Sequence, residues 1–575
     1  MKKSFLSKIT AIMLSFTIIF SLCACNASQP TNNSPKNGAK KIITDTRDVY
    51  LPNGQSQAFN VAYYENEEEV LFVEIQYAVT ELLSNFALIR TDNTISFEEN
   101  DTQVLLTRDN ESYCELDFVK DTVCFDNFDS FSTAGYSAIP HDMLAFPYVN
   151  DEGQKEYFDR RDSFYTPGYA IEIDLAERNI PLDIYGGKKY IPLQTFNDIF
   201  LCPFGCNIAY NGENLFALNG NTIEDEIASL YYAKESAQRS SALTEFNYNE
   251  LCLFLDLYYG LQDVHGFTDG FDYYLDSIGL KNEFLTPDAT DSFNALGSLT
   301  LGYIADLHST VVGASPYVGA PKPSDDANIK LSSSFIDYMG ANTIYNTARA
   351  NALGEVDFYQ KVGDTAFVTF DSFTLERSGN YQDDLEQPLG DTLAIISIAH
   401  QLISADSEIK NVVLDLSCNG GGAVDSAIYT VAWMLGYCDF SIADSATGSK
   451  ATVTYKADVN FDHVFDDNDT IKDKNLYCLV SPVSFSCGNL VPALLKASSK
   501  VTIVGKTSTG GGCAVRHGVT ADGTTFNISN SKQFATVKNG TYYSVDHGVE
   551  PDIPLTKIES FYDRAGLAEY LDGLK

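Results

Sequence analysis

The chain has 575 residues, which is long enough for several domains. Its 78 acidic residues outnumber the 38 basic ones, so the formal net charge at pH 7 is −40. Such a surface repels phosphate backbones, which argues against nucleic acid as a partner, while 44% hydrophobic residues are enough to build cores.

The first 25 residues have the organisation of a targeting segment. Lysines precede an apolar stretch, residues 9–22, that is too short for an ordinary membrane-spanning helix. The stretch ends in Leu22-Cys-Ala-Cys25, which resembles a bacterial lipoprotein cleavage box with Cys25 as the lipidated first residue. Residues 1–25 are therefore predicted to be a lipoprotein signal peptide and residues 26–44 a flexible tether, which places the protein outside the cytoplasm on the bacterial membrane. The alternative is a simple secretory signal.

Residues 45–221 are predicted to form an α+β accessory domain with a weak internal repeat. Residues 70–79 recur loosely as residues 189–198, each a strand running into a helix and followed by a hairpin. This pattern resembles the N-terminal module of copper amine oxidase-like surface proteins, but no histidine cluster for copper is present. A generic accessory domain fits equally well.

Residues 222–315 are predicted to be a helical segment, because residues 251–258 carry apolar side chains at helical spacing. The segment ends near His308, which follows Asp306-Leu307. Residues 316–355 contain Gly, Pro and Ser and are predicted to be a linker or lid, too short for a peptide-binding PDZ module.

Residues 356–575 alternate strand and helix patterns, which predicts an α/β core. One buried strand ends in a glycine loop, Asn419-Gly-Gly-Gly422, that opens onto a helix at residues 423–435. A second buried strand, residues 476–480, leads into a turn with Ser486 and then into a helix. A serine on a sharp turn between strand and helix has the layout of a nucleophile elbow.

Together, these motifs resemble the carboxyl-terminal processing, or tail-specific, serine peptidases. The family motif Asp-Leu-Arg-x-Asn-x-Gly-Gly matches residues 415–422, with Ser417 in place of arginine. The nucleophile motif matches residues 486–489, with Asn489 where glutamate is more usual. The lysine of the bacterial Ser-Lys branch falls on Gly511, so the chain is more similar to the tricorn-core branch, which uses serine and histidine.

The resemblance covers residues 243–552 and implies a multidomain α/β and α+β protein with a ClpP/crotonase-like catalytic core. It implies Ser486 as the nucleophile and His308 as the general base, with Asp546 as the best-fitting acid to orient the histidine. Ser309 is a second group that could orient His308.

Backbone N–H groups of Cys487 and of a glycine in the pair Gly420-Gly421 are the expected oxyanion donors. The thiol of Cys487 is a weaker candidate nucleophile than Ser486. Lys506 and His547 are the alternative bases.

A second motif has the spacing of an EF-hand calcium loop. Its oxygen donors stand at positions 1, 3, 5, 9 and 12, with a backbone carbonyl at position 7: Asp458, Asn460, Asp462, Asp466, Asp469 and, for the carbonyl, Val464. A solvated acidic loop is the alternative, and any calcium would be structural, since no cofactor is required. Gly505-Lys-Thr507 resembles the end of a phosphate-binding loop, but Lys500 stands where that motif needs glycine, which excludes nucleotide.

The sequence therefore predicts a surface-anchored serine endopeptidase whose substrates are proteins or peptides. The alternative is a catalytically inactive lipoprotein that binds peptide or cell-wall polymer, since Ser417 and Asn489 depart from the family pattern. A solute-binding lipoprotein would explain the tether but not the nucleophile turn.

Overall fold

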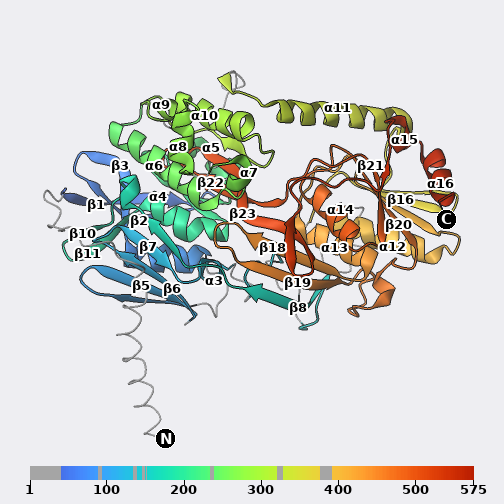
Figure 1. The fold of residues 1–575 in the computed structure, drawn as a ribbon. Helices are drawn as coiled ribbons and strands as arrows, with labels where there is room; N and C mark the ends of the chain where they lie inside the picture. The colour runs from blue at the N-terminus through green and yellow to red at the C-terminus, as the bar shows by residue number, and fades with distance from the viewer. Residues whose placement is uncertain are drawn as a thin grey trace, which may run out of the picture.

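The computed structural model describes residues 40–87, 94–109, 111–133, 139–144, 149, 152–233, 238–267, 269–319, 328–375 and 391–574. The predicted signal peptide with Cys25 and most of the predicted tether lie outside these residues. Within them, no helix is both long enough and apolar enough to cross a membrane. The described residues form four β-sheets with helices packed against them (Figure 1).

The first sheet has seven strands and belongs to the accessory region. Its order is β10 (Asp183–Tyr185), β11 (Lys188–Pro192), β3 (Glu67–Glu74), β2 (Ser56–Tyr64), β1 (Ile42–Tyr50), β13 (Leu215–Asn219) and β12 (Cys206–Tyr210). The repeated strands β3 and β11 are antiparallel neighbours, with Ile191 opposite Val73. Each runs directly into a helix, α2 (Ile75–Ala78) or α4 (Leu193–Phe196), so both copies of the repeat fold alike.

The second sheet of the accessory region has five strands. These are β4 (Ile95–Glu99), β5 (Gln103–Arg108), β6 (Ser112–Asp117), β7 (Thr122–Phe125) and β9 (Ile171–Asp174), all antiparallel. The short helix α3 (Phe128–Phe131) follows β7, and Asn127 caps it by accepting a hydrogen bond from the Ser130 N–H.

The helical segment packs on the accessory region rather than standing apart. It contains α5 (Asp225–Tyr231), α6 (Ser241–Tyr258), α7 (Gln262–His265), α8 (Gly270–Ser277), α9 (Lys281–Phe284), α10 (Ala289–Ser298) and the π-helix η5 (Leu299–Ile304). The buried face of α6 shares one hydrophobic core with the accessory strands and with Phe526 and Ile528, which lie far along the chain. Residues 45–221 and 222–315 therefore do not have separate cores.

A third sheet crosses the predicted domain boundaries. Its strands are β14 (Thr310–Gly313), β23 (Thr525–Lys538), β18 (Cys438–Asp444), β19 (Lys450–Ala457) and β8 (Phe158–Thr166), with β22 (Cys513–Val519) and β24 (Thr541–Ser544) also paired to β23. Strand β8 comes from the predicted accessory domain but pairs with β19 over eight residue pairs, from Lys450↔Thr166 to Ala457↔Phe158. In Figure 1 it lies beside β19, among strands of the C-terminal half.

The fourth sheet carries the α/β core. Its order is β15 (Tyr359–Val362), β16 (Thr365–Thr369), β17 (Asn411–Asp415), β20 (Asn475–Val480), β21 (Val501–Gly505) and β25 (Ile553–Pro554), parallel from β16 onward. Alternate side chains of each strand enter different cores. Val412 and Leu414 pack with α12 (Thr392–Ala405), α13 (Val424–Leu435) and α14 (Cys487–Ala497), whereas Val413 packs with α15 (Glu559–Tyr562) and α16 (Arg564–Asp572).

The predicted linker or lid contains a long helix, α11 (Ser333–Leu353). Ser332 caps its start by accepting a hydrogen bond from the Phe335 N–H. The helix crosses from α10 to α15 (Figure 1), where Tyr345 meets Phe561 edge to face at 5.3 Å between ring centroids. The Gly, Pro and Ser of residues 316–355 obscured it, because they gather before the helix begins.

Candidate active site

Ser486 lies where β20 turns into α14. Its backbone angles are φ 56° and ψ −123°, a region that residues with a side chain rarely adopt. The Ser486 N–H donates to the Gly510 carbonyl at 2.8 Å, and the Ser486 carbonyl accepts from the Leu490 N–H at 2.8 Å. The side chain is partly exposed. A strained, fixed and accessible serine at a helix N-terminus is the geometry of a nucleophile elbow.

The glycine loop after β17 packs directly against this serine. Gly421 has φ 108°, and a Cβ placed on it would lie 2.6 Å from the Ser486 Cβ and 3.1 Å from its Oγ. Gly488, in the first turn of α14, likewise leaves no room, since its Cβ would lie 2.4 Å from the Asn419 carbonyl oxygen. Both glycines are needed for loop and turn to approach, which explains why the two motifs occur together.

The predicted oxyanion donors are not equally available. The Gly420 N–H donates to the Asp371 carbonyl at 3.1 Å, and the Gly421 N–H donates to the Asn419 Oδ1 at 2.9 Å. The Cys487 N–H, at the first position of α14, has no hydrogen-bond partner within the described residues. The structure thus differs from the prediction for Gly420 and Gly421, because the loop uses their amides to hold its own shape.

His308 is brought to the same place by β14 and the preceding loop. Its ring packs on Phe485, the neighbour of Ser486, with 4.7 Å between ring centroids. Its Nδ1 lies 3.3 Å from the Ser529 Oγ, and its Nε2 is buried without a hydrogen-bond partner within the described part of the chain. Burial lowers the pKa of His308 below 6.5, while the charges of Asp306 and Asp546 raise it. The imidazole is therefore neutral at pH 7.

Neither predicted orienting group contacts the imidazole. The Ser309 Oγ donates to the Asp306 Oδ2 at 2.7 Å, and Asp546 accepts from the Gly512 N–H at 2.8 Å. Asp546 is still close enough for its charge to act on His308. The contact that the ring makes is with Ser529, which the sequence did not indicate.

Asn489 links the nucleophile to the segment that carries Asp546. It is fully buried, its Nδ2 donates to the Val545 carbonyl at 2.7 Å, and its Oδ1 accepts from the Ser508 Oγ at 2.6 Å. The Ser508 Oγ in turn accepts from the Val549 N–H at 2.7 Å. In the sequence Asn489 counted only as a departure from the family motif. The amide supplies both a donor and an acceptor, which a carboxylate cannot do.

The alternative catalytic groups are poorly placed. Gly511 has φ 84°, and a Cβ there would lie 2.4 Å from the Phe485 ring, so the position has no room for a lysine. Lys506 and His547 are exposed side chains. The thiol of Cys487 is buried beside the Gly422 carbonyl, and burial raises its pKa to about 12, so it is not a thiolate nucleophile.

Ser417 stands at the motif position where the family has arginine. The Ser417 Oγ lies 3.3 Å from the Tyr562 hydroxyl. Asp415, two residues earlier, is paired with Arg564 of α16 at 2.6 Å, and both side chains are buried. A charge from the C-terminal helix thus holds the strand that leads to the glycine loop.

The predicted calcium loop is closed by its own amides. Asp458 accepts hydrogen bonds from the N–H groups of Phe461, Asp462 and His463, and Asp469 accepts from those of Val459, Asn460 and Asp466. Burial, with the charges of Asp469 and Asp462, raises the pKa of Asp458 to about 7. Three of the other predicted ligands also accept hydrogen bonds from loop N–H groups: Asn460 from Asp462, Asp462 from Val464, and Asp466 from Asn468.

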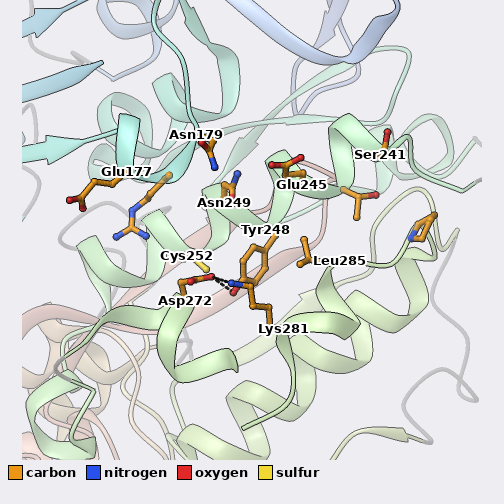
Figure 2. A pocket seen from close by; sticks show the side chains of 13 residues that line it. Glu177, Asn179, Ser241, Glu245, Tyr248, Asn249, Cys252, Asp272, Lys281 and Leu285 are labelled. Atoms are coloured by element: carbon orange, nitrogen blue, oxygen red, sulfur yellow. Dashed lines mark hydrogen bonds and ion pairs between the residues drawn. The ribbon is translucent and has the colours of Figure 1, made fainter. Parts of the chain in front are cut away.

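A polar pocket of about 560 Å³ lies away from Ser486, between the accessory region and the helical segment. Figure 2 shows Lys281 and Tyr248 directed at Asp272, which accepts a hydrogen bond from each at 2.7 Å. Asn179 and Asn249 line its other side. The pocket holds none of the predicted catalytic residues.

Comparison with known proteins identifies the class of the C-terminal part. Residues 365–555 match the model of peptidase family S41. This match assigns residues 365–555, about a third of the chain, to a serine-type peptidase domain. A comparison with curated proteins returned no match.

Solved structures give weaker likenesses. A photosystem II D1 C-terminal processing protease is 21% identical over 35% of this chain and 46% of its own, with a TM-score of 0.26. A putative peptidase from Parabacteroides merdae is 17% identical over 58% and 97%, with a TM-score of 0.40. Mature CPAF is 12% identical over 58% and 97%, with a TM-score of 0.35. All three TM-scores are below 0.5, so the family assignment depends on the domain match alone.

Proposed function

We propose that the protein is a serine endopeptidase that hydrolyses protein or peptide substrates with Ser486 as nucleophile and His308 as general base. The observation that carries the proposal is the backbone of Ser486. A strained φ of 56° is costly, and here the Gly510 carbonyl, the glycine loop and the first turn of α14 all hold it in place. A serine with only a structural role would not need that conformation.

The chemistry follows from the surrounding groups. Neutral His308 accepts the hydroxyl proton as the Ser486 Oγ attacks the scissile carbonyl, and it later protonates the leaving amine. The Nε2 of His308 is the nitrogen without a partner, so it is the atom that must reach Ser486. The Cys487 N–H and the N-terminus of α14 favour the negative charge that develops on the carbonyl oxygen. Asp546 favours the imidazolium form by its charge.

A fluorophosphonate probe, which reacts with activated serines, tests the nucleophile. We expect wild type to be labelled and Ser486→Ala not to be. Ser498→Ala is the matched control, because Ser498 ends the same helix and its Oγ donates only to the Leu495 carbonyl. Labelling that survives in Ser486→Ala would refute the assignment.

One observation favours the second candidate, an inactive lipoprotein that binds peptide or cell-wall polymer. No hydrogen bond joins Ser486 to His308 within the described residues, and the Phe485 ring packs against the imidazole. The same probe decides, because a folded wild-type protein that is never labelled would favour binding over catalysis.

Two further parts of the proposal concern location and fold class. Cys25 is proposed to carry a diacyl anchor that holds the enzyme on the outer face of the bacterial membrane, since a single acyl chain gives only marginal attachment. The parallel sheet from β16 to β25, with helices on both faces, is proposed to be the ClpP/crotonase-like version of an α/β core.

A further inference from the structure

A cluster of buried polar side chains lies where the accessory region meets the third sheet. Asp129 comes from α3, His141 from the loop that follows, and Asp444 from the end of β18. One possible ligand atom from each lies within 4.8 Å of the other two, and all three residues are buried. The peptidase mechanism uses none of them.

Two atoms in this cluster lack the partners that buried polar groups normally have. The Asp129 Oδ1 and the His141 Nδ1 make no hydrogen bond within the described residues, although the two residues are only 2% and 4% exposed. The Asp129 Oδ1 faces the His141 Nε2 at 3.6 Å. Two ligand atoms on one tetrahedral Zn²⁺ are about 3.3 Å apart, close to the separation of this pair. The His141 Nε2 already lies 2.7 Å from the Ser449 Oγ, so an ion shared by the pair would displace that hydroxyl or bind it as well.

The other contacts hold the cluster in shape. The Asp129 Oδ2 accepts from the Thr447 Oγ1 at 2.7 Å, and the His141 Nε2 lies 2.7 Å from the Ser449 Oγ. Asp444 accepts from the N–H groups of Ala446 and Thr447 and from the Ser531 Oγ. These hydroxyls are further oxygen donors beside the three residues.

Charge is the remaining consideration. The His141 imidazole is 4% exposed, so it lies in a site from which water is largely excluded. Lys532 acts on Asp129 and Asp444, but no ion pair within 4.0 Å joins it to either among the described residues.

We propose that Asp129, His141 and Asp444 bind a first-row divalent cation, Zn²⁺ or Mn²⁺, that fastens the accessory region to the catalytic half. Two carboxylates and an imidazole suit these ions. The ion would join α3 and its following loop to the turn between β18 and β19. Its role is structural, because no predicted catalytic residue belongs to the cluster.

Metal analysis of the full mature chain, made without a polyhistidine tag, tests this proposal. The protein is dialysed against EDTA, incubated with ZnCl₂ or MnCl₂, separated from free ion and measured by elemental mass spectrometry. We expect about one ion per chain in wild type and a higher melting temperature with the ion bound. Asp129→Asn should lose the ion. Asp439→Asn, at an exposed position of β18, the strand that ends at Asp444, is the matched control and should keep it.

A substitution of Lys532 distinguishes a metal site from an ordinary buried charge network. If an ion binds, Lys532→Met removes a repelling charge and should tighten binding by about tenfold or more. If Lys532 is instead the permanent counter-charge, the same change should lower stability and no ion should bind. Wild type that takes up no Zn²⁺ or Mn²⁺, or uptake unchanged in Asp129→Asn, would overturn the proposal.

Discussion

Replacing Asn489 with alanine should disturb catalysis through a residue that never touches the substrate. The change removes the donor to the Val545 carbonyl and the acceptor of the Ser508 hydroxyl in a buried place, while Ser508 keeps its hydrogen bond from the Val549 N–H. An unsatisfied buried group costs about 1–3 kcal/mol, so the two together lower the local stability by about 2–6 kcal/mol. The segment that carries Asp546 should then separate from the first turn of α14.

The expected result is a slower and shifted reaction with the fluorophosphonate probe. The charge of Asp546 raises the pKa of His308, so moving Asp546 away should lower that pKa. The inflection in a plot of labelling rate against pH should therefore move to lower pH. The rate on the plateau should fall by about 10-fold to 100-fold, the size of effect that a small misplacement of catalytic groups produces.

Asn207→Ala is the matched control. Asn207 is 1% exposed and also uses both ends of its amide, donating to the Gly220 carbonyl and accepting from the Asn197 Nδ2. It lies in the accessory region, so its loss should lower the melting temperature without moving the inflection. If Asn489→Ala keeps the wild-type rate and inflection, or if Asn207→Ala shifts the inflection equally, the positioning role of Asn489 is wrong. If wild type is not labelled at all, the proposed function fails before this question arises.

Four other measurements follow from the sequence and the structure. His308→Ala should lose most probe labelling, and an unchanged rate in the variant would reopen the choice of base. In wild type the labelling rate should rise with pH through an inflection below 6.5, because burial lowers the pKa of His308. Cys25→Ser should move the protein from the membrane fraction to the medium, and retention in the membrane would argue against lipidation. If the loop at residues 458–469 binds Ca²⁺, excess Ca²⁺ should raise the melting temperature. The increase should be larger at pH 8 than at pH 6, because the pKa of Asp458 is near 7 and protons compete with the ion at the lower pH. Identical melting curves in chelator and in Ca²⁺ would exclude the site. Arg564→Leu should lower the free energy of unfolding by about 3–5 kcal/mol, because it leaves a buried carboxylate unpaired, and urea unfolding with no change in midpoint would contradict this.

The sequence was informative wherever function depends on a short stretch of chain. The glycine loop at residues 419–422 and the turn at Ser486 could be placed because each needs glycines and a serine at fixed spacing. The family match over residues 365–555 bears out the serine peptidase class that these motifs predicted. The strands and helices of the α/β core were predictable because hydrophobic spacing, too, is a property of a short stretch of chain.

Only the tertiary structure shows which distant residues meet. Hydrophobic spacing could not indicate that β8 leaves the accessory region, or that the β22–β23 hairpin enters the core of the helical segment, because strand pairing depends on partners far along the chain. For the same reason, the sequence could not indicate that the N–H groups of Gly420 and Gly421 already donate hydrogen bonds to Asp371 and Asn419. Motif spacing records which residue types a site needs, whereas hydrogen-bond partners and shared cores depend on how separate segments pack, which one stretch of sequence does not determine.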